Sequence, residues 1–253
     1  MSKEILCEIK DKIAEADLVL VGIGEQIAVP TKLMIKDEKY SIYLEDESKI
    51  EYLPYLQQIF IKEKEQDYLD FYNRLSQLLE GKNYYVLTTN ADDVIYKSNI
   101  DENRIVAPCG SIKQFVCNEC NGDIEIFEED NIAKNQLFFY ENKIEKMHVK
   151  CCPNCNKMMQ PNVVTYNYYD ETGYLEKWNR YTKWLQGTVN RKLCILELGV
   201  GLSYPTVIRW PNEKIVTYNN KAFMFRIHDK LFQLSEGISE RAKSVAENPM
   251  NII

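Results

Sequence analysis

The chain has 253 residues, of which 45% are hydrophobic and 27% are charged, as in an ordinary globular protein with one full core. Its net charge of −7 excludes the broad positive field of a general nucleic-acid binder. No stretch approaches the roughly 18 apolar residues of a membrane helix, and the first residues resemble no signal peptide. We therefore expect a cytoplasmic protein without membrane contact.

Helices and buried strands alternate along the first third of the chain. Isoleucines at four-residue spacing predict an amphipathic helix over residues 3–15. The apolar run 17–21 predicts a buried strand that ends in the turn Gly22-Ile23-Gly24. Residues 30–64 are mixed and polar, which indicates an insertion outside the sheet. A helix over 66–80 follows and ends at Gly81, so that 30–80 forms a helical part.

The rest of the chain continues the alternation around a small module at 111–160. A buried strand at 84–87 leads into Thr88-Thr89-Asn90. Beyond the module we expect a short strand at 163–166, a helix at 174–186 and a strand at 193–198 that runs into Gly199-Val200-Gly201. Strands at 215–218 and 223–227 and a closing helix at 234–247 complete the chain. This pattern predicts an α/β fold with a Rossmann-like parallel sheet, in which ligands bind at the carboxyl ends of the strands.

Two Cys-x2-Cys pairs lie in the small module and indicate a structural zinc site. Cys117 and Cys120 form the first pair, and Cys152 and Cys155 form the second. Four thiolates can close a tetrahedral site, which leaves no open position for catalysis. The alternatives are four unrelated thiols, or Cys151 in place of Cys152. The long gap between the pairs favours a small three-stranded module, inserted between residues 1–110 and 161–253, which would form the nucleotide-binding domain. The use of cysteine fits a reducing compartment.

The order of these motifs resembles the sirtuins, which are NAD-dependent protein deacylases and ADP-ribosyltransferases. Residues 88–92, Thr-Thr-Asn-Ala-Asp, are similar to the catalytic Thr-Gln-Asn-Ile-Asp turn of that family. Gly110-Ser111 stands before the first zinc cysteine at the family's spacing, and residues 160–164 resemble its Arg-Pro-x-Val-Val segment. Residues 16–24 and 196–201 are most similar to the microbial, macrodomain-linked (class M) branch. The resemblance covers roughly 3–253 and is weakest at 30–64.

The resemblance implies NAD as a cofactor, zinc as a structural ion, and roles for single residues. Asn90 would hold the ribose and a water near the nicotinamide-bearing carbon. Asp92 would stabilise the positive charge that develops as nicotinamide leaves. Ordinary turn capping by Asn90 and Asp92 is the alternative. The cofactor-binding residues would be Gly22, Gly24, Thr88, Thr89, Asn90, Asp92, Gly199 and Gly201, with the first two glycines at the diphosphate and the last two at the adenosine side.

Several positions depart from the family pattern. The general-base histidine falls at Cys109, and a thiol with its ordinary pKa of about 8.5 is a poor base. Neither His148, beside the zinc ligands, nor His228, in a late strand, is placed to replace it. Class M members also lack this histidine and are associated with ADP-ribosyl transfer, so its loss disfavours deacylation more than transfer. We interpret Cys109 as a packed small residue rather than a nucleophile or redox-sensitive thiol.

The loop after the first strand departs further. It has Glu25, Gln26 and Ala28 where the family has Ala, Gly and Ser, and a carboxylate there would repel a pyrophosphate. Two hypotheses follow. The first is an NAD-dependent ADP-ribosyltransferase or NAD-cleaving enzyme that acts on a protein side chain with a partly degenerate pocket. The second is a catalytically inactive sirtuin-like protein that binds a peptide, metabolite or partner in the same cleft. Protein deacylation is a weaker third.

Overall fold

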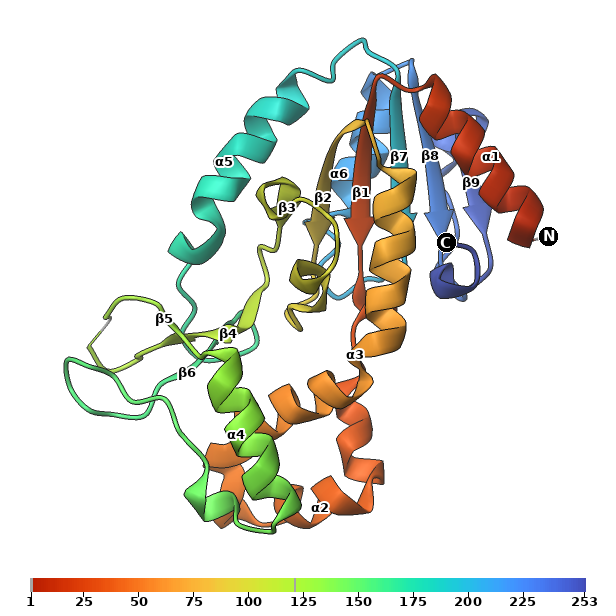
Figure 1. The fold of residues 1–253 in the computed structure, drawn as a ribbon. Helices are drawn as coiled ribbons and strands as arrows, with labels where there is room; N and C mark the ends of the chain where they lie inside the picture. Colours follow the sequence, from red (N-terminus) through yellow and green to blue (C-terminus); the bar gives the residue numbers. More distant parts are fainter. Residues whose placement is uncertain (1, 121) are drawn as a thin grey trace.

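The computed structural model describes residues 2–120 and 122–253, in which a six-stranded sheet lies beside a smaller three-stranded one (Figure 1). The order in the large sheet is β3-β2-β1-β7-β8-β9, and all neighbouring strands run parallel. This confirms the predicted α/β class with a Rossmann-like sheet. The strands of the large sheet are β1 (Leu18–Ile23), β2 (Asn83–Thr88), β3 (Ile105–Val106), β7 (Leu193–Leu198), β8 (Ala222–Ile227) and β9 (Ala242–Val245).

Helices cover both faces of the large sheet (Figure 1). Side chains alternate between the faces of a strand, so Val19 and Val21 pack on one side and Leu18 and Leu20 on the other. Because both faces are buried, β1 consists of apolar residues and glycine throughout. None of the described helices is long and apolar enough to cross a bilayer. The helices against the sheet are α1 (Ser2–Glu15), α3 (Leu53–Leu78), α5 (Thr172–Gln186) and α6 (Arg209–Tyr218).

The smaller sheet has the order β5-β4-β6 and antiparallel pairing, as expected for a three-stranded module. Its strands are β4 (Gly110–Val116), β5 (Glu125–Ile126) and β6 (Gln160–Val163). Next to it, α2 (Glu38–Leu44), the first half of α3 and α4 (Glu129–Tyr140) form a helical group (Figure 1). Tyr40 joins the three helices, since its ring lies 5.3 Å from that of Phe60 and 4.6 Å from that of Phe139. Residues 30–64 are therefore mainly helical and contribute no strand to the sheet, as predicted.

Two predicted elements near the carboxyl end are wrong. Residues 215–218 end helix α6 instead of forming a strand. Their β-branched side chains suggested a strand, but the buried residues Arg209, Asn212 and Val216 follow the helical period. The closing helix at 234–247 is replaced by a 3₁₀ turn, Glu236–Arg241, and by strand β9. Strand β9 pairs with β8 and satisfies backbone groups that an edge strand would leave open.

Three further boundaries differ from the prediction. The strand expected at 163–166 lies at Gln160–Val163, because the Tyr166 amide donates to Val163 O and closes a turn. The helix expected from residue 66 begins at Leu53, with a proline in its first turn. Helix α4 lies inside the small module, where we predicted no helix. None of these shifts moves a cysteine pair or a glycine turn.

A buried ion pair fixes α6 against the sheet just before the second glycine turn. Arg226 Nε on β8 donates to Glu197 Oε1 on β7 at 2.6 Å, and both side chains are fully buried. Arg226 Nη1 also donates to Glu213 Oε1 on α6 at 2.7 Å. Burial raises the pKa of Glu197, while the two neighbouring guanidinium groups lower it. The carboxyl end of β7 is thereby held in one position before the chain turns at Gly199.

Candidate active site and metal centre

The order of the strands reverses between β1 and β7, at the centre of the large sheet. The chain proceeds from β1 to β2 on one side and from β7 to β8 on the other. The connections that follow β1 and β7 therefore lead to opposite sides of the sheet, and the topology predicts a crevice at the carboxyl ends of these strands. In open parallel sheets this crevice is where ligands bind. Both predicted glycine turns end at this crevice.

Glycines bring the two loops into direct contact. The Gly24 amide donates to Leu198 O at 3.0 Å, and the Gln26 amide donates to Gly199 O at 3.2 Å. A Cβ atom on Gly24 would lie 2.4 Å from Val200 Cα, so no larger residue fits there. Gly199 has a φ of +63°, in the left-handed region that favours glycine. Gly22 instead lies within β1 and packs against Ile208.

The Glu25 carboxylate lies across this crevice. Its Oε2 accepts the Gly201 amide at 3.1 Å, and its Oε1 accepts the Ser203 hydroxyl at 3.2 Å. A Cβ atom on Gly201 would lie 1.9 Å from Glu25 Oε1, so glycine at 201 leaves the space that the carboxylate fills. A backbone amide at the switch point, which could bind an anionic ligand, thus already has an anionic partner.

The turn after β2 lies next to these loops and carries Asn90 and Asp92. The Asn90 amide donates to Thr88 Oγ1 at 3.1 Å, and the Thr89 amide donates to Ile23 O at 3.0 Å. Asp92 Oδ1 accepts the Val94 amide at 3.1 Å, which is turn capping, and its Oδ2 accepts the distant Val29 amide at 2.9 Å. Burial raises the pKa of Asp92. Asp92 therefore links the loop after β1 to the turn after β2.

Asn90 carries a buried donor without a hydrogen bond of normal geometry. Its Nδ2 atom is inaccessible and makes no such bond to any described residue, and the same is true of the Tyr72 hydroxyl. The two groups are neighbours, since the Asn90 side chain lowers the pKa of Tyr72. Burial, and next the charge of Asp92, raise the pKa of Tyr72 well above its ordinary value. An unpaired buried donor costs about 1–3 kcal/mol and is rare in folded proteins. Such a donor is typical of a site that binds a polar ligand or water.

A cavity of about 390 Å³ opens beside Asp92. Asp92 is the sole charged residue in its lining, and Asn90 does not line it. The loop after β1, the first half of α3 and the segment after β6 supply the other walls. Such a cavity suits an apolar or aromatic group next to a positive charge, because the carboxylate stabilises that charge where water is scarce. The lining residues are Ala28, Val29, Thr31, Leu53, Gln57, Ile61, Ala91, Asp92, Ile112, Val163, Thr165 and Tyr166.

Solved sirtuin structures match this architecture over nearly the whole chain. The structure of Sir2Tm bound to a propionylated peptide is 18% identical, covers 98% of this chain and 93% of its own, and superposes with a TM-score of 0.55. A structure described as the structural basis of sirtuin substrate affinity is 16% identical, covers 97% of both chains and gives a TM-score of 0.53. The chain has the sirtuin fold. This confirms the resemblance predicted from the motifs, whereas the likeness to class M stays a prediction.

Curated relatives carry names from ADP-ribosylation. A protein ADP-ribosyltransferase of Staphylococcus aureus is 21% identical over 187 residues, which are 72% of this chain and 58% of that protein. A probable bifunctional ADP-ribose hydrolase/ADP-ribosyltransferase of Fusarium oxysporum f. sp. cubense is 27% identical over 54% of this chain and 24% of that protein. The chain thus spans between a quarter and three fifths of these relatives. No model of a known family matches the sequence.

Cys109 stands in this sirtuin fold where the sequence placed the missing histidine, and its environment makes it a poor base. The side chain is buried, and its carbonyl accepts the Val164 amide at 3.1 Å. Burial, with a smaller effect of Glu25, raises the pKa of the thiol to about 12. The thiol therefore stays protonated at neutral pH, and a packed residue remains the favoured interpretation of Cys109.

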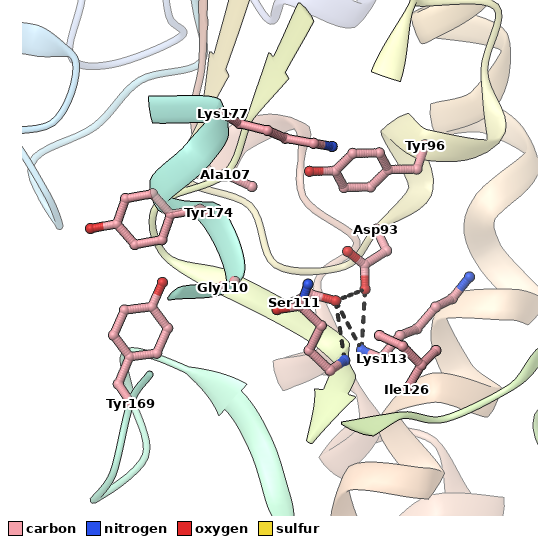
Figure 2. A pocket seen from close by; sticks show the side chains of 12 residues that line it. Asp93, Tyr96, Ala107, Gly110, Ser111, Lys113, Ile126, Tyr169, Tyr174 and Lys177 are labelled. Atoms are coloured by element: carbon pink, nitrogen blue, oxygen red, sulfur yellow. Dashed lines mark hydrogen bonds between the residues drawn. The ribbon is translucent and has the colours of Figure 1, made fainter. Parts of the chain in front are cut away.

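A second cavity, of about 240 Å³, lies on the other side of β4 (Figure 2). Asp93 has a φ of 62°, so it turns away from Asp92 and lines this second cavity. Its Oδ2 accepts the Ser111 hydroxyl at 2.6 Å and the Lys113 amide at 3.2 Å, which Figure 2 shows as dashed lines. Tyr96, Lys177 and two further tyrosines complete the walls seen there. Asp92 and Asp93, which are adjacent in one turn, thus line two different cavities.

Asp93 predicts a pH-dependent stability. Burial raises its pKa from 3.8 to about 6, although Ser111 and Lys113 oppose the shift. A carboxyl whose folded pKa is raised contributes stability that is fully present below about pH 4 and is lost as the pH rises through 6, on the order of 3 kcal/mol. Asp93→Asn keeps an acceptor for both hydrogen bonds and cannot titrate. Urea unfolding between pH 4 and 7 should show the variant gaining stability relative to wild type as the pH rises. A constant difference between the two proteins would contradict this assignment.

The two cysteine pairs meet as predicted. The Sγ atoms of Cys117, Cys120, Cys152 and Cys155 all lie within 4.8 Å of one another. Those of Cys120 and Cys152 are 3.4 Å apart, and those of Cys117 and Cys155 are 3.5 Å apart. Sulfur atoms at about 2.3 Å from a tetrahedral zinc would be separated by nearly this much, so the donor set fits zinc. Cys151 and His148 lie outside the cluster.

The sequence did not reveal several groups of the site. His228 is largely buried just beyond β8, and its Nδ1 accepts the Lys230 and Leu231 amides at 3.0 Å, so it packs a turn. Tyr72 lies on a buried face of α3, where nothing in the sequence indicates that its hydroxyl makes no hydrogen bond of normal geometry to a described residue. Ser203 carries no motif. The adjacent acids at 92 and 93 were visible in the sequence, but only the left-handed backbone separates their roles.

Proposed function

We propose that this chain is an NAD-dependent ADP-ribosyltransferase whose reaction centre is the cavity beside Asp92. The observation that carries the proposal is the buried turn after β2, where the sole charged group of the cavity stands two residues from an unpaired Asn90 donor. The names of the curated relatives and the sirtuin fold support the same chemistry. When bound, NAD would supply an ADP-ribosyl group joined to nicotinamide by a cleavable glycosidic bond.

Asn90 and Asp92 would have different roles in this reaction. Asn90 Nδ2 would donate to a ribose hydroxyl if its side chain turned toward the cavity, because Nδ2 is inaccessible and Asn90 does not line the cavity in this structure. The Asp92 carboxylate, oriented by the Val29 and Val94 amides, stabilises positive charge that develops at the reacting carbon. A protein side chain is the acceptor that we favour, since a sirtuin of this fold has been solved with a peptide.

Transfer is favoured over deacylation because the chain offers no base at Cys109. A thiol with a pKa of about 12 does not remove a proton from a ribose hydroxyl at neutral pH. The zinc would be structural, in a module at 111–160 between the two parts of an NAD-binding domain. A cytoplasmic location remains a prediction, and so does the likeness to class M.

A specific observation favours the second candidate, a catalytically inactive binding protein. The Glu25 carboxylate accepts a hydrogen bond from the Gly201 amide, which would otherwise be free to bind a diphosphate. One experiment separates the two functions. The zinc-loaded protein is incubated with NAD labelled in the adenine ring and with a candidate acceptor protein, and nicotinamide release and bound label are measured. We expect nicotinamide release with label retained on protein, and no deacylation of an acetyl-lysine peptide. Absence of nicotinamide release from wild type and from Glu25→Ala would overturn the transferase proposal.

A further inference from the structure

Among the described residues, the switch-point crevice offers an anion few donors and no cation in ion-pair contact, although Arg209 and His228 lie close enough to interact electrostatically with Glu25. In the part of the chain that the structure describes, no lysine or arginine forms an ion pair with Glu25, whose carboxylate accepts the Gly201 amide and the Ser203 hydroxyl. Arg209 lies nearby, but its guanidinium donates to the Val200, Leu231 and Gln233 carbonyls. A diphosphate in this crevice would therefore depend on backbone amides and hydroxyls. The Glu25 carboxylate already accepts hydrogen bonds from the Gly201 amide and the Ser203 hydroxyl.

The contact can open without unfolding the loop. Glu25 is exposed and begins a 3₁₀ turn, Glu25–Ile27, whose backbone is fixed by its own bonds. The Gln26 amide bonds to Gly199 O and the Ala28 amide to Glu25 O, so the main chain stays in place when the side chain rotates. Only the two side-chain bonds of Glu25 have to break. A rotamer change is thus enough to free the Gly201 amide.

We infer that the Glu25 carboxylate is a built-in anion that occupies the diphosphate subsite, so that a phosphate-bearing ligand binds only after Glu25 rotates away. The inference rests on the proposed function, because it takes the switch-point crevice as the place where the dinucleotide phosphates bind. Glu25 then determines specificity. Its charge weakens the binding of every ligand that places a negative charge at Gly201. The binding of uncharged ligands in the same crevice is unaffected.

Two substitutions separate the charge of Glu25 from its bulk. Glu25→Gln keeps an oxygen that can accept the Gly201 amide but removes the negative charge. Glu25→Ala removes both the charge and the occupant. The matched control is Glu240→Gln, an exposed glutamate just before the edge strand β9, at the amino ends of the strands, whereas the crevice lies at their carboxyl ends in the centre of the sheet. It changes the net charge by the same amount and touches neither loop.

The test is calorimetric titration of the zinc-loaded protein with ADP and with adenosine. We expect ADP to bind about tenfold more tightly to Glu25→Gln than to wild type, and more tightly still to Glu25→Ala. Glu240→Gln should match wild type, and the affinity for adenosine should change less than about twofold in every variant. In nuclear magnetic resonance spectra, ADP should move the Gly201 amide signal of Glu25→Ala.

Three results would overturn the inference. ADP affinity that is equal in wild type and both Glu25 variants would show that the carboxylate does not compete with phosphate. An equal gain for adenosine would show that Glu25 acts by bulk alone. A lack of ADP binding to every variant at millimolar concentration would show that the crevice is no phosphate subsite. ADP has no glycosidic bond to nicotinamide, so these outcomes are independent of NAD cleavage, and failure of the transferase proposal would be recognised separately.

Discussion

Asn90→Ala is expected to lower the rate of NAD cleavage at least about 100-fold while leaving the protein as stable as wild type or slightly more stable. The donor that this change removes makes no hydrogen bond of normal geometry to a described residue, and the neighbouring Tyr72 hydroxyl is already without one, so its loss breaks no formed hydrogen bond. In addition, the cost of burying an unpaired donor disappears. Activity and stability should thus move independently, which is typical of a residue retained for function.

Nicotinamide release and thermal unfolding, measured on the same preparations, would check this result. Asn99→Ala is the matched control, since Asn99 lies nine residues further along the same connection and its side chain is exposed. It should leave both quantities unchanged. If Asn90→Ala cleaves NAD at the wild-type rate, Asn90 is not part of the reaction centre.

Asp92→Asn should also reduce cleavage, but with a loss of stability. An amide has one acceptor oxygen, whereas the two oxygens of Asp92 accept the Val29 and Val94 amides separately. One of these amides would then lose its partner in a buried place, at a cost of about 1–3 kcal/mol. The contrast with Asn90→Ala distinguishes a residue that also positions the loop after β1 from one that serves the ligand alone.

The parts of the fold that were predicted correctly depend on local or short-range patterns. Apolar runs that end in glycine identified β1 and β7, because both faces of a central parallel strand are buried. Two cysteine pairs identified the four-cysteine cluster, because a pair at this spacing places two potential zinc ligands in one turn. In both cases the constraint, burial of a strand or ligand spacing in a turn, acts on residues that are close in the chain, so it is visible in the sequence.

The parts that were predicted wrongly depend on contacts between distant segments. Ile215 and its neighbours have strand propensity, yet α6 forms because Val216 packs against the sheet and Arg209 and Asn212 join the network of Glu197. Strand β9 forms because β8 leaves its edge unpaired. The contact of Glu25 with Gly201 joins residues 176 positions apart. The sequence identified Glu25 as unfavourable for a pyrophosphate but could not show which group it binds.

Loss of the metal is expected to have the largest effect on stability. Removing zinc with a chelator, or replacing Cys152 by serine, should lower the unfolding temperature by about 10 °C or more, since binding of a structural zinc contributes directly to folding. The first cysteine pair follows β4 directly, and Ile112 on β4 lines the cavity beside Asp92. Loosening the cluster should therefore also reduce NAD cleavage, although no cysteine contacts the reaction centre.

Cys151 provides the control for this experiment. It precedes Cys152 in the chain, is exposed, and lies outside the cluster. Cys151→Ser should keep a full complement of zinc, measured by native mass spectrometry, together with the wild-type unfolding temperature, whereas Cys152→Ser should lose both. Equal metal content in the two variants would contradict the assigned ligands. Because the two cysteines are adjacent and chemically identical, a difference between them must come from where the fold directs each sulfur atom: Cys152 into the cluster and Cys151 away from it.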